Sequence, residues 1–140
     1  MKFVTTKTKT KEMRAFTEKE WAIADTEHFG RPSRWQEQQS YIRVVDKGKI
    51  LGVLLYSFKA GVMKIETIIV SQKQQGHGVG SELMVRAEEV ARKEGLHKLF
   101  LSTGEGWNVT GFYKKLGFVQ TGELKKHYLK RDWVEFSKFL

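Results

Sequence analysis

A loop with three glycines constrains this chain more than any other feature of its sequence. Residues 68–84 read IIVSQKQQGHGVGSELM, with glycine at positions 76, 78 and 80. The β-branched residues before the loop predict a strand, and the apolar spacing after it predicts a helix. Unpaired backbone N–H groups at the start of such a helix, together with the helix dipole, favour an anion. Because glycines let the anion approach the backbone closely, the loop predicts a phosphate site.

Two other phosphate loops do not fit this spacing. The nucleotide-hydrolase loop ends in Gly-Lys-Ser/Thr, whereas Gly80 is followed by Ser81 and Glu82. The dinucleotide fingerprint is Gly-x-Gly-x-x-Gly, whereas these glycines are evenly spaced. Residues 75–80 match Gln/Arg-x-x-Gly-x-Gly/Ala instead.

Turn residues and apolar periodicity predict the other elements. A capping box at Thr17 predicts a first helix through about Phe29, ended by Gly30 and Pro32. Residues 33–40 fit either a loop or a second short helix. Strands are expected at residues 41–45, 50–58, 62–70, 99–101, 118–121 and 133–139. Two further helices are expected, one that begins at residue 79 and is ended by Gly95, and one over residues 107–116. The helix after the loop should bury one face, formed by Val79, Leu83, Met84, Ala87, Val90 and Ala91. This order predicts an α/β (α+β) fold in which a mixed sheet has a strand-helix-strand crossover at its centre.

Composition narrows the class of protein. With 140 residues the chain is expected to form one domain, residues 1–140. The absence of cysteine excludes zinc-thiolate sites and cysteine nucleophiles, and four scattered histidines predict no metal centre. No apolar run reaches the length of a membrane span, and residues 1–10 lack the apolar core of a signal peptide, so we expect a cytoplasmic protein without membrane contact.

The formal net charge of +9 favours polyanionic partners. Nucleic acid is one candidate and a multiply phosphorylated cofactor is another. A solubilising basic surface explains the charge equally well. The basic residues are dispersed and no aromatic-basic recognition motif is present, so no specific nucleic-acid binding is expected.

The loop and two further segments resemble the GNAT superfamily of acetyltransferases, which bind acetyl-coenzyme A (acetyl-CoA). Residues 65–70 resemble the central strand of that family, and residues 111–118 resemble its FYxKxGF segment. The resemblance implies the GNAT fold, with a mixed, mostly antiparallel central sheet, helices on both faces and a β-α-β core that binds acetyl-CoA. It implies an N-acetyltransferase that transfers acetyl from acetyl-CoA to a primary amine by direct attack.

The same resemblance implies which residues hold acetyl-CoA. The central strand should diverge from its neighbour after Val70, so that backbone groups of residues 68–70 pair with the pantetheine arm and an N–H polarises the thioester carbonyl. The expected contacts are Ile68, Ile69, Val70, Gln75, Gly76, His77, Gly78, Val79, Gly80, Ser81 and Asn108. Gln75 replaces the commoner arginine, so Lys73 or His77 would have to supply the charge. Asn108 lies closer to the matched tyrosine than the asparagine of the family does.

Two residues are candidates for catalysis. Glu66 is the candidate base, since a carboxylate half-buried on the strand face of Ile68 and Val70 should have a raised pKa. The alternative is an edge-facing glutamate paired with a lysine such as Lys64 or Lys98. Tyr113, within the matched segment, is the candidate acid that protonates the departing thiolate. Its alternative is an aromatic side chain packed in the core.

The identity of the acceptor stays open: it is either a small-molecule amine or a peptide or protein amine. Whether the chain forms a homodimer stays open as well. Candidate acceptor residues are Glu18, Glu20, Trp21, Glu27, Phe29, Trp35 and Glu37 near the N-terminus and His127, Tyr128, Arg131 and Trp133 near the C-terminus. Two alternative functions are a coenzyme A-binding module without turnover and a basic nucleic-acid-binding domain.

Overall fold

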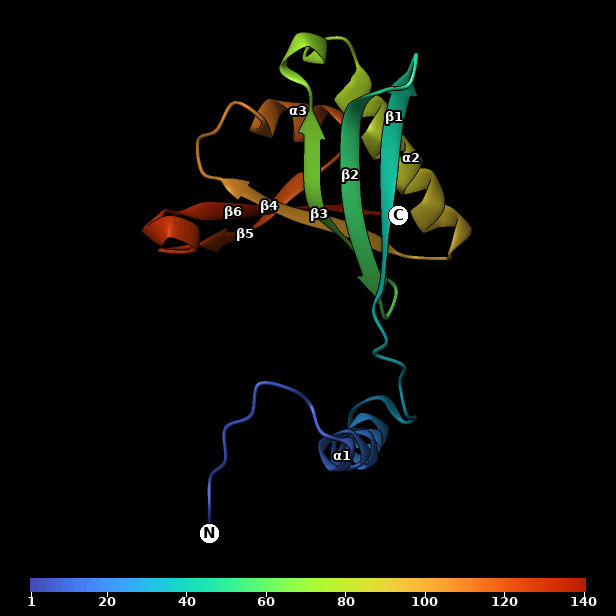
Figure 1. Cartoon of the computed structure of the whole chain (residues 1–140), viewed down its shortest axis with the longest axis vertical. Coiled ribbons are helices and arrows are strands. Elements are labelled where there is room, and N and C mark those ends of the chain that lie inside the picture. The colour runs from blue at the N-terminus through green and yellow to red at the C-terminus, as the bar shows by residue number, and fades with distance from the viewer. The chain divides into compact units, whose positions relative to one another are not determined.

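The computed structural model describes residues 1–140, which form two compact units, residues 1–35 and 36–140 (Figure 1). Each unit is described by itself. That the whole chain works as one domain stays a prediction. No helix in either unit is both long enough and apolar enough to cross a bilayer.

The first unit is built around helix α1, Lys11–Phe29. The helix begins six residues before the predicted Thr17, because Thr10 caps it: the Thr10 side chain accepts a hydrogen bond from the N–H of Met13 at 3.1 Å. Thr17 lies within the helix, where its hydroxyl donates to the carbonyl of Arg14. The predicted end is confirmed, since Gly30 takes the left-handed conformation with φ 73°.

The second unit is a six-stranded sheet in the order β1-β2-β3-β4-β6-β5. Its elements are β1 Gln38–Asp46, β2 Lys49–Lys59, β3 Val62–Val70, the 3-10 helix η1 Gln72–Gln74, α2 Val79–Lys93, β4 Lys98–Gly104, α3 Thr110–Lys115, β5 Val119–Leu124, the 3-10 helix η2 Tyr128–Lys130 and β6 Trp133–Phe139. Only β3 and β4 run parallel, so the predicted mixed, mostly antiparallel sheet and its β3-α2-β4 crossover are confirmed.

Some boundaries differ from those predicted. Residues 33–37 are loop, and the polar residues 38–40 extend β1, where they pair with the end of β2. Helix α3 begins at Thr110 rather than 107, because Gly106 at φ 75° and a bond from the N–H of Trp107 to the carbonyl of Gly104 turn the chain first. The two short 3-10 helices were not predicted.

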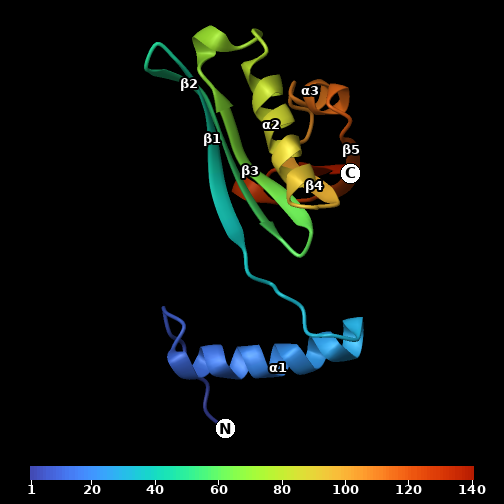
Figure 2. The ribbon, with the colours of Figure 1, turned by 90° about the vertical axis from the view of Figure 1, so that its right-hand side faces the viewer.

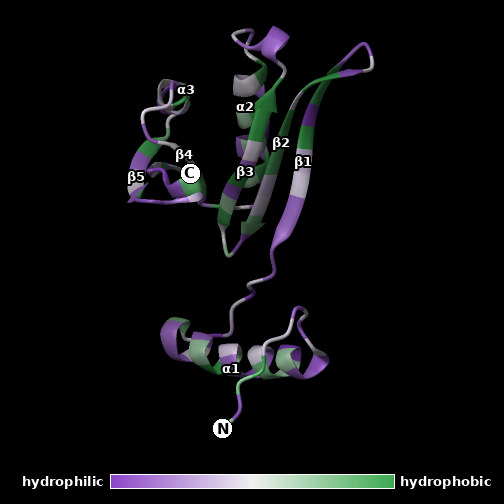
Figure 3. Ribbon diagram, turned by 60° about the vertical axis from the view of Figure 1, so that its left-hand side comes forward, coloured by the Kyte–Doolittle hydropathy of each residue, from purple (hydrophilic) through white to green (hydrophobic).

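Helix α2 packs against one face of the sheet (Figure 2). The predicted apolar face is confirmed: Leu83, Met84, Ala87 and Ala91 are buried, and Val79 and Val90 pack against the same core. On the sheet side this core contains Leu54, Met63, Leu99 and Phe136. Hydrophobic residues concentrate along the strands, whereas the loop before α2 is hydrophilic (Figure 3). A helix on the second face of the sheet stays a prediction.

A β-bulge changes which face of β3 meets the core. Tyr56 of β2 pairs with Ile65, and Leu55 pairs with Thr67, so Glu66 is an extra residue without a partner. Before the bulge Met63 and Ile65 are buried in the core, and after it Ile68 packs there. Glu66 therefore lies on the face opposite the core.

Candidate functional site

The centre of the sheet is open on one side of β3. Strands β3 and β4 pair only through residues 62–64 with 98–100, while β4 goes on to pair with β6 along its whole length. Figure 1 shows β3 and β4 leading apart beyond that point. The divergence begins after Lys64, not after Val70 as predicted, because the pairing with β4 ends before the bulge at Glu66. Residues 65–70 thus present an unpaired backbone edge toward β4.

The glycine loop presents a row of unpaired backbone donors at the carboxyl end of β3. Gly76 and Gly78 have φ of 79° and 84°, and a Cβ on either would meet nothing within 4 Å. The first intrahelical bond of α2 runs from Glu82 N–H to the carbonyl of Gly78. The N–H groups of Gly76, Gly78, Val79, Gly80 and Ser81 have no partner in the protein, and no side chain caps the helix. Such a row suits the oxygens of a phosphate or pyrophosphate.

The polar side chains of the loop turn toward its own backbone. Gln75 Nε2 donates to the carbonyl of Val70 at 3.4 Å, and His77 Nδ1 lies 3.1 Å from the carbonyl of Gln75. Neither side chain supplies a fixed positive charge to the row of donors. Lys73, in η1, has no acidic partner within 4 Å. Lys73 is therefore the cation available near the loop.

Three of the predicted site segments meet at Gly80. A Cβ built on Gly80 would lie 3.4 Å from Cζ of Phe112 in α3 and 3.6 Å from Cγ2 of Val70 in β3. The end of β3, the start of α2 and the α3 segment are therefore adjacent. Asn108 is different, because it is exposed and makes no hydrogen bond within the protein. Its predicted cofactor contact stays a prediction.

Tyr113 combines a core position with an accessible hydroxyl. The residue is only 6% exposed, and its ring packs against Phe112, Phe118 and Phe136. No buried side-chain oxygen or nitrogen lacks a partner, and the Tyr113 hydroxyl bonds to no protein group, so the hydroxyl itself reaches the surface. Burial raises the pKa of Tyr113 above its usual value of 10.0. The phenol consequently stays protonated at neutral pH.

Glu66 is an ion-paired carboxylate. Lys64 Nζ donates to Oε2 at 2.9 Å, and Ser57 Oγ donates to Oε1 at 2.9 Å. Burial alone would raise the pKa of Glu66, but the bonds from Lys64 and Ser57 and the charge of Lys64 together lower it. The predicted raised pKa is thus wrong, and so is the predicted shared face with Ile68 and Val70, which the bulge reverses.

The pairing of Glu66 with Lys64 has a signal in the sequence, whereas its bond with Ser57 has none. Residues two apart on a strand share a face, so Lys64 is a natural partner of Glu66. The role of Ser57 depends on the register of β2 against β3, which carries no local sequence signal.

The structure gathers no group of three or more His, Asp or Glu side chains around a metal position. A metal-free site stays a prediction.

Comparisons with known proteins agree with this geometry. The sequence pattern of the acetyltransferase (GNAT) family matches residues 8–118. An acetyltransferase from Bacillus cereus superposes with a TM-score of 0.73 over 98% of each chain at 19% identity. A Bacillus subtilis acetyltransferase solved in complex with CoA gives 0.68 at 20% identity, over 84% of this chain and 83% of that one. An IAA acetyltransferase from Bacillus cereus gives 0.63 at 27% identity, over 71% and 77% of the two chains.

Proposed function

This chain belongs to the acetyltransferase (GNAT) family and is an acyltransferase, and on that premise we propose that it transfers the acetyl group of acetyl-CoA to a primary amine by direct attack. The observation that carries the proposal is the row of five unpaired N–H groups from Gly76 to Ser81, next to an unpaired edge of β3. A Bacillus subtilis relative of the same fold has been solved with CoA, which supports the same ligand for this chain.

Each part of acetyl-CoA has a matching feature in the chain. The pyrophosphate would accept hydrogen bonds from the loop donors, aided by the positive end of the α2 dipole and by Lys73. The pantetheine arm carries amide groups that suit an unpaired strand edge, here residues 65–70. A free N–H on that edge would hydrogen-bond the thioester carbonyl and stabilise the negative charge that develops on its oxygen.

The reaction requires two proton movements. The amine nitrogen attacks the acetyl carbon, a C–N bond forms, and the C–S bond breaks. The nitrogen loses one proton, and the departing thiolate gains one. Tyr113 is proposed as the donor to the thiolate, since its hydroxyl is accessible and stays protonated at neutral pH.

Glu66 is proposed as the proton acceptor for the amine. Lys64 and Ser57 hold its carboxylate ionised at neutral pH, so it is always in the accepting form. The lowered pKa makes it a weaker base than the half-buried carboxylate expected from the sequence. It therefore assists a neutral amine better than it can deprotonate an ammonium ion.

The test is release of coenzyme A thiol from acetyl-CoA in the presence of a panel of amines and peptides. We expect acceptor-dependent release together with a raised melting temperature when acetyl-CoA is added. Absence of any thermal shift at millimolar acetyl-CoA would refute the binding site. A shift without release for any acceptor would favour the alternative of a coenzyme A-binding module without turnover.

A further inference from the structure

Two exposed aromatic side chains, Trp107 and Tyr128, and the half-buried Trp133 gather where β4 ends and β6 begins. The ring of Trp133 lies 5.2 Å from that of Trp107 and 5.2 Å from that of Tyr128, centroid to centroid, and His127 packs on Tyr128 at 4.2 Å. Trp107 and Tyr128 are 52% and 56% exposed, although both are large aromatic residues. We call Trp107, Tyr128 and Trp133 the aromatic shelf. Rings held together in this way and left open to solvent are typical of binding surfaces.

The backbone holds the shelf in place at a cost in strain. Lys126, Leu129 and Lys130 have φ of 48°, 56° and 58°, a conformation that costs a residue with a side chain about 1–2 kcal/mol. The turn is fixed by a bond from the Trp133 indole N–H to the carbonyl of Tyr128 and by a bond from the N–H of Lys126 to Asp132. Strain of this kind concentrates at ligand sites.

Trp107 depends on a glycine beneath it. A Cβ on Gly104 would lie 2.1 Å from Cε2 of Trp107, so the indole lies directly against the backbone of Gly104 at the end of β4. Trp107 belongs to the segment that leads into α3, the helix of Tyr113. The shelf is therefore attached to the β4 side of the opening between β3 and β4.

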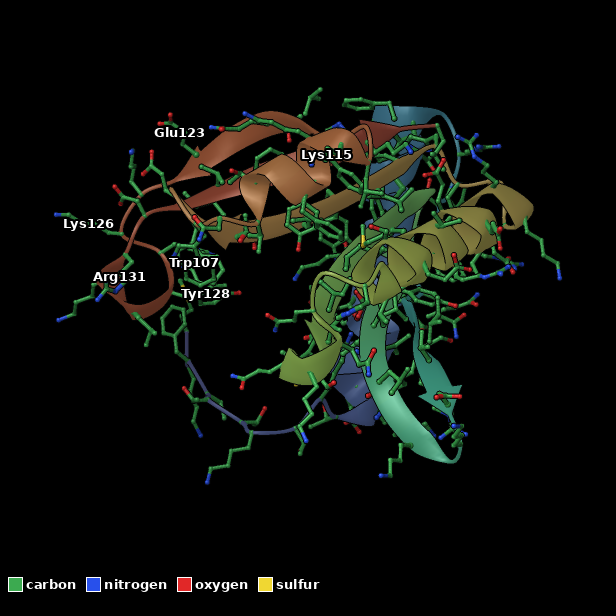
Figure 4. The ribbon with its side chains drawn as sticks, turned by 90° about the horizontal axis from the view of Figure 1, so that it is seen from above. Trp107, Lys115, Glu123, Lys126, Tyr128 and Arg131 are labelled. Atoms are coloured by element: carbon green, nitrogen blue, oxygen red, sulfur yellow. The ribbon has the colours of Figure 1, made fainter.

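One member of the shelf, Tyr128, lies within electrostatic range of Lys64 on β3. The hydrogen bond to Glu66 raises the pKa of Lys64, burial opposes this, and Tyr128 is among the nearby groups that add to the rise. In Figure 4 Trp107 and Tyr128 lie inward of Lys126 and Arg131, whose side chains are at the outer edge of the second unit. The shelf thus borders the opening on its β4 side, where Trp107 lies against Gly104 and precedes α3.

The charge around the shelf is positive. Lys126, Lys130 and Arg131 have no acidic partner within 4 Å, whereas Lys125 is paired with Glu105, Glu123 and Asp132. Aromatic rings attract a cation by about 0.5–1 kcal/mol at exposed sites. Lys126 and Arg131 point outward in Figure 4, so their repulsion of a bound cation acts from a distance, and it grows with the charge of the acceptor. The same field lowers the pKa of a bound amine, which favours the neutral form that can attack.

We propose that the acceptor is a primary amine carried by a flat aromatic group without further positive charge, whose ring packs on the shelf of Trp107, Tyr128 and Trp133. This inference rests on the proposed function and names the substrate class of the same site. It disfavours polyamines and other polycations as acceptors.

The experiment compares matched amines in the thiol-release assay. 2-Phenylethylamine and 2-cyclohexylethylamine have the same chain and similar size, and only the first has a flat aromatic ring. An aromatic pair contributes about 0.5–1.5 kcal/mol beyond burial, which corresponds to a kcat/KM about 2- to 13-fold higher for 2-phenylethylamine. Spermidine should be the poorest of the three. A direct measurement, quenching of tryptophan fluorescence by each amine, reports binding without turnover.

Two glycine variants test the shelf without changing its rings. Gly104→Ala should displace Trp107 and raise the KM for 2-phenylethylamine while the KM for acetyl-CoA is unchanged. Gly122→Ala on β5 is the control, because its Cβ would meet only Glu135 Cβ at an ordinary 3.6 Å. Trp107→Ala should reproduce the Gly104→Ala effect.

The outcomes separate this inference from the proposed function. Turnover of spermidine that exceeds turnover of 2-phenylethylamine, or an unchanged KM in both Gly104→Ala and Trp107→Ala, overturns the inference and leaves the acetyltransferase intact. Thiol release with none of these amines and with no member of the wider panel of amines and peptides, despite a thermal shift with acetyl-CoA, overturns both.

Discussion

Replacing Gly78 by alanine tests the central claim that the glycine loop binds the phosphates. Gly78 has φ 84°, its N–H and those of the next three residues are unpaired, and its missing Cβ points into open space. Gly95, just beyond the other end of α2, has φ 70° and equally open surroundings. Gly95→Ala is therefore a matched control, with the same added atom and the same kind of strain but no anion site.

The expected magnitudes follow from these features. Alanine in the left-handed region costs about 1–2 kcal/mol, so both variants should lose about that much stability without ligand. A hydrogen bond to a charged group contributes about 1.5–3 kcal/mol, so each hydrogen bond to phosphate that Gly78→Ala breaks should weaken acetyl-CoA binding about 10- to 150-fold. At a concentration about one hundred times the wild-type Kd, ligand stabilises the fold by about 2.7 kcal/mol. A hundredfold weaker affinity would reduce that gain to about 0.4 kcal/mol.

Denaturant unfolding with and without acetyl-CoA, together with calorimetric titration, measures both quantities. The wild type and Gly95→Ala should gain the same stability from ligand, and Gly78→Ala should gain far less. Equal gains in the two variants would refute the assignment of the phosphates to this loop. Alanine is preferable to valine here, because a β-branched residue at φ 84° adds strain that would confuse the comparison.

Three further predictions concern single groups and the net charge. Tyr113→Phe should keep acetyl-CoA affinity and lower kcat by about 10²- to 10⁴-fold where chemistry limits the rate; full activity would exclude Tyr113 as the acid. Glu66→Gln should destabilise the fold above pH 4.5, the usual pKa of this carboxyl, and the difference from wild type should vanish as the pH falls through the lowered folded-state pKa. A difference that persists in acid would mean that the ion pair with Lys64 is not its cause. Binding to duplex DNA should be weak, without preferred sequence, and should collapse between low and physiological salt, as filter binding would show; tight binding that survives salt would favour a nucleic-acid function.

Local patterns in the sequence are sufficient to predict the strand, loop and helix that form the proposed phosphate site. These elements, from residue 62 to 93, follow from β-branched residues, evenly spaced glycines and a 3.6-residue apolar repeat, all of which are short-range signals. The buried face of α2 is predictable residue by residue for the same reason. Gly30 and Gly95 end their helices as expected, because glycine is favoured at left-handed positions.

The features that could not be predicted depend on pairing between strands. An alternating pattern assigns Glu66 to the face of Ile68, but one extra residue in the β2–β3 pairing reverses that assignment. The early divergence of β3 from β4 is equally non-local, because it depends on where the pairing of residues 62–64 with residues 98–100 ends, while β6 pairs with the opposite edge of β4. The start of α1 differs for another reason, since Thr10 and Thr17 both offer a capping side chain and the capping-box pattern favours Thr17.

The environments of Glu66 and Tyr113 push their pKa values apart, which has a consequence for the pH dependence of the reaction. Lys64 and Ser57 keep the carboxylate ionised, and burial keeps the phenol protonated, so neither group changes form near neutral pH. The group that does change form is the acceptor amine, which must be neutral to attack. The rate at low acceptor concentration, kcat/KM, should therefore rise with pH along the pKa of the free amine, and acceptors of lower pKa should reach the plateau earlier. An alkylamine has a pKa of about 10.4, like lysine, so kcat/KM should be measured from about pH 6 to about pH 11 with two amines of different pKa. A midpoint that is the same for both amines would belong to the enzyme instead.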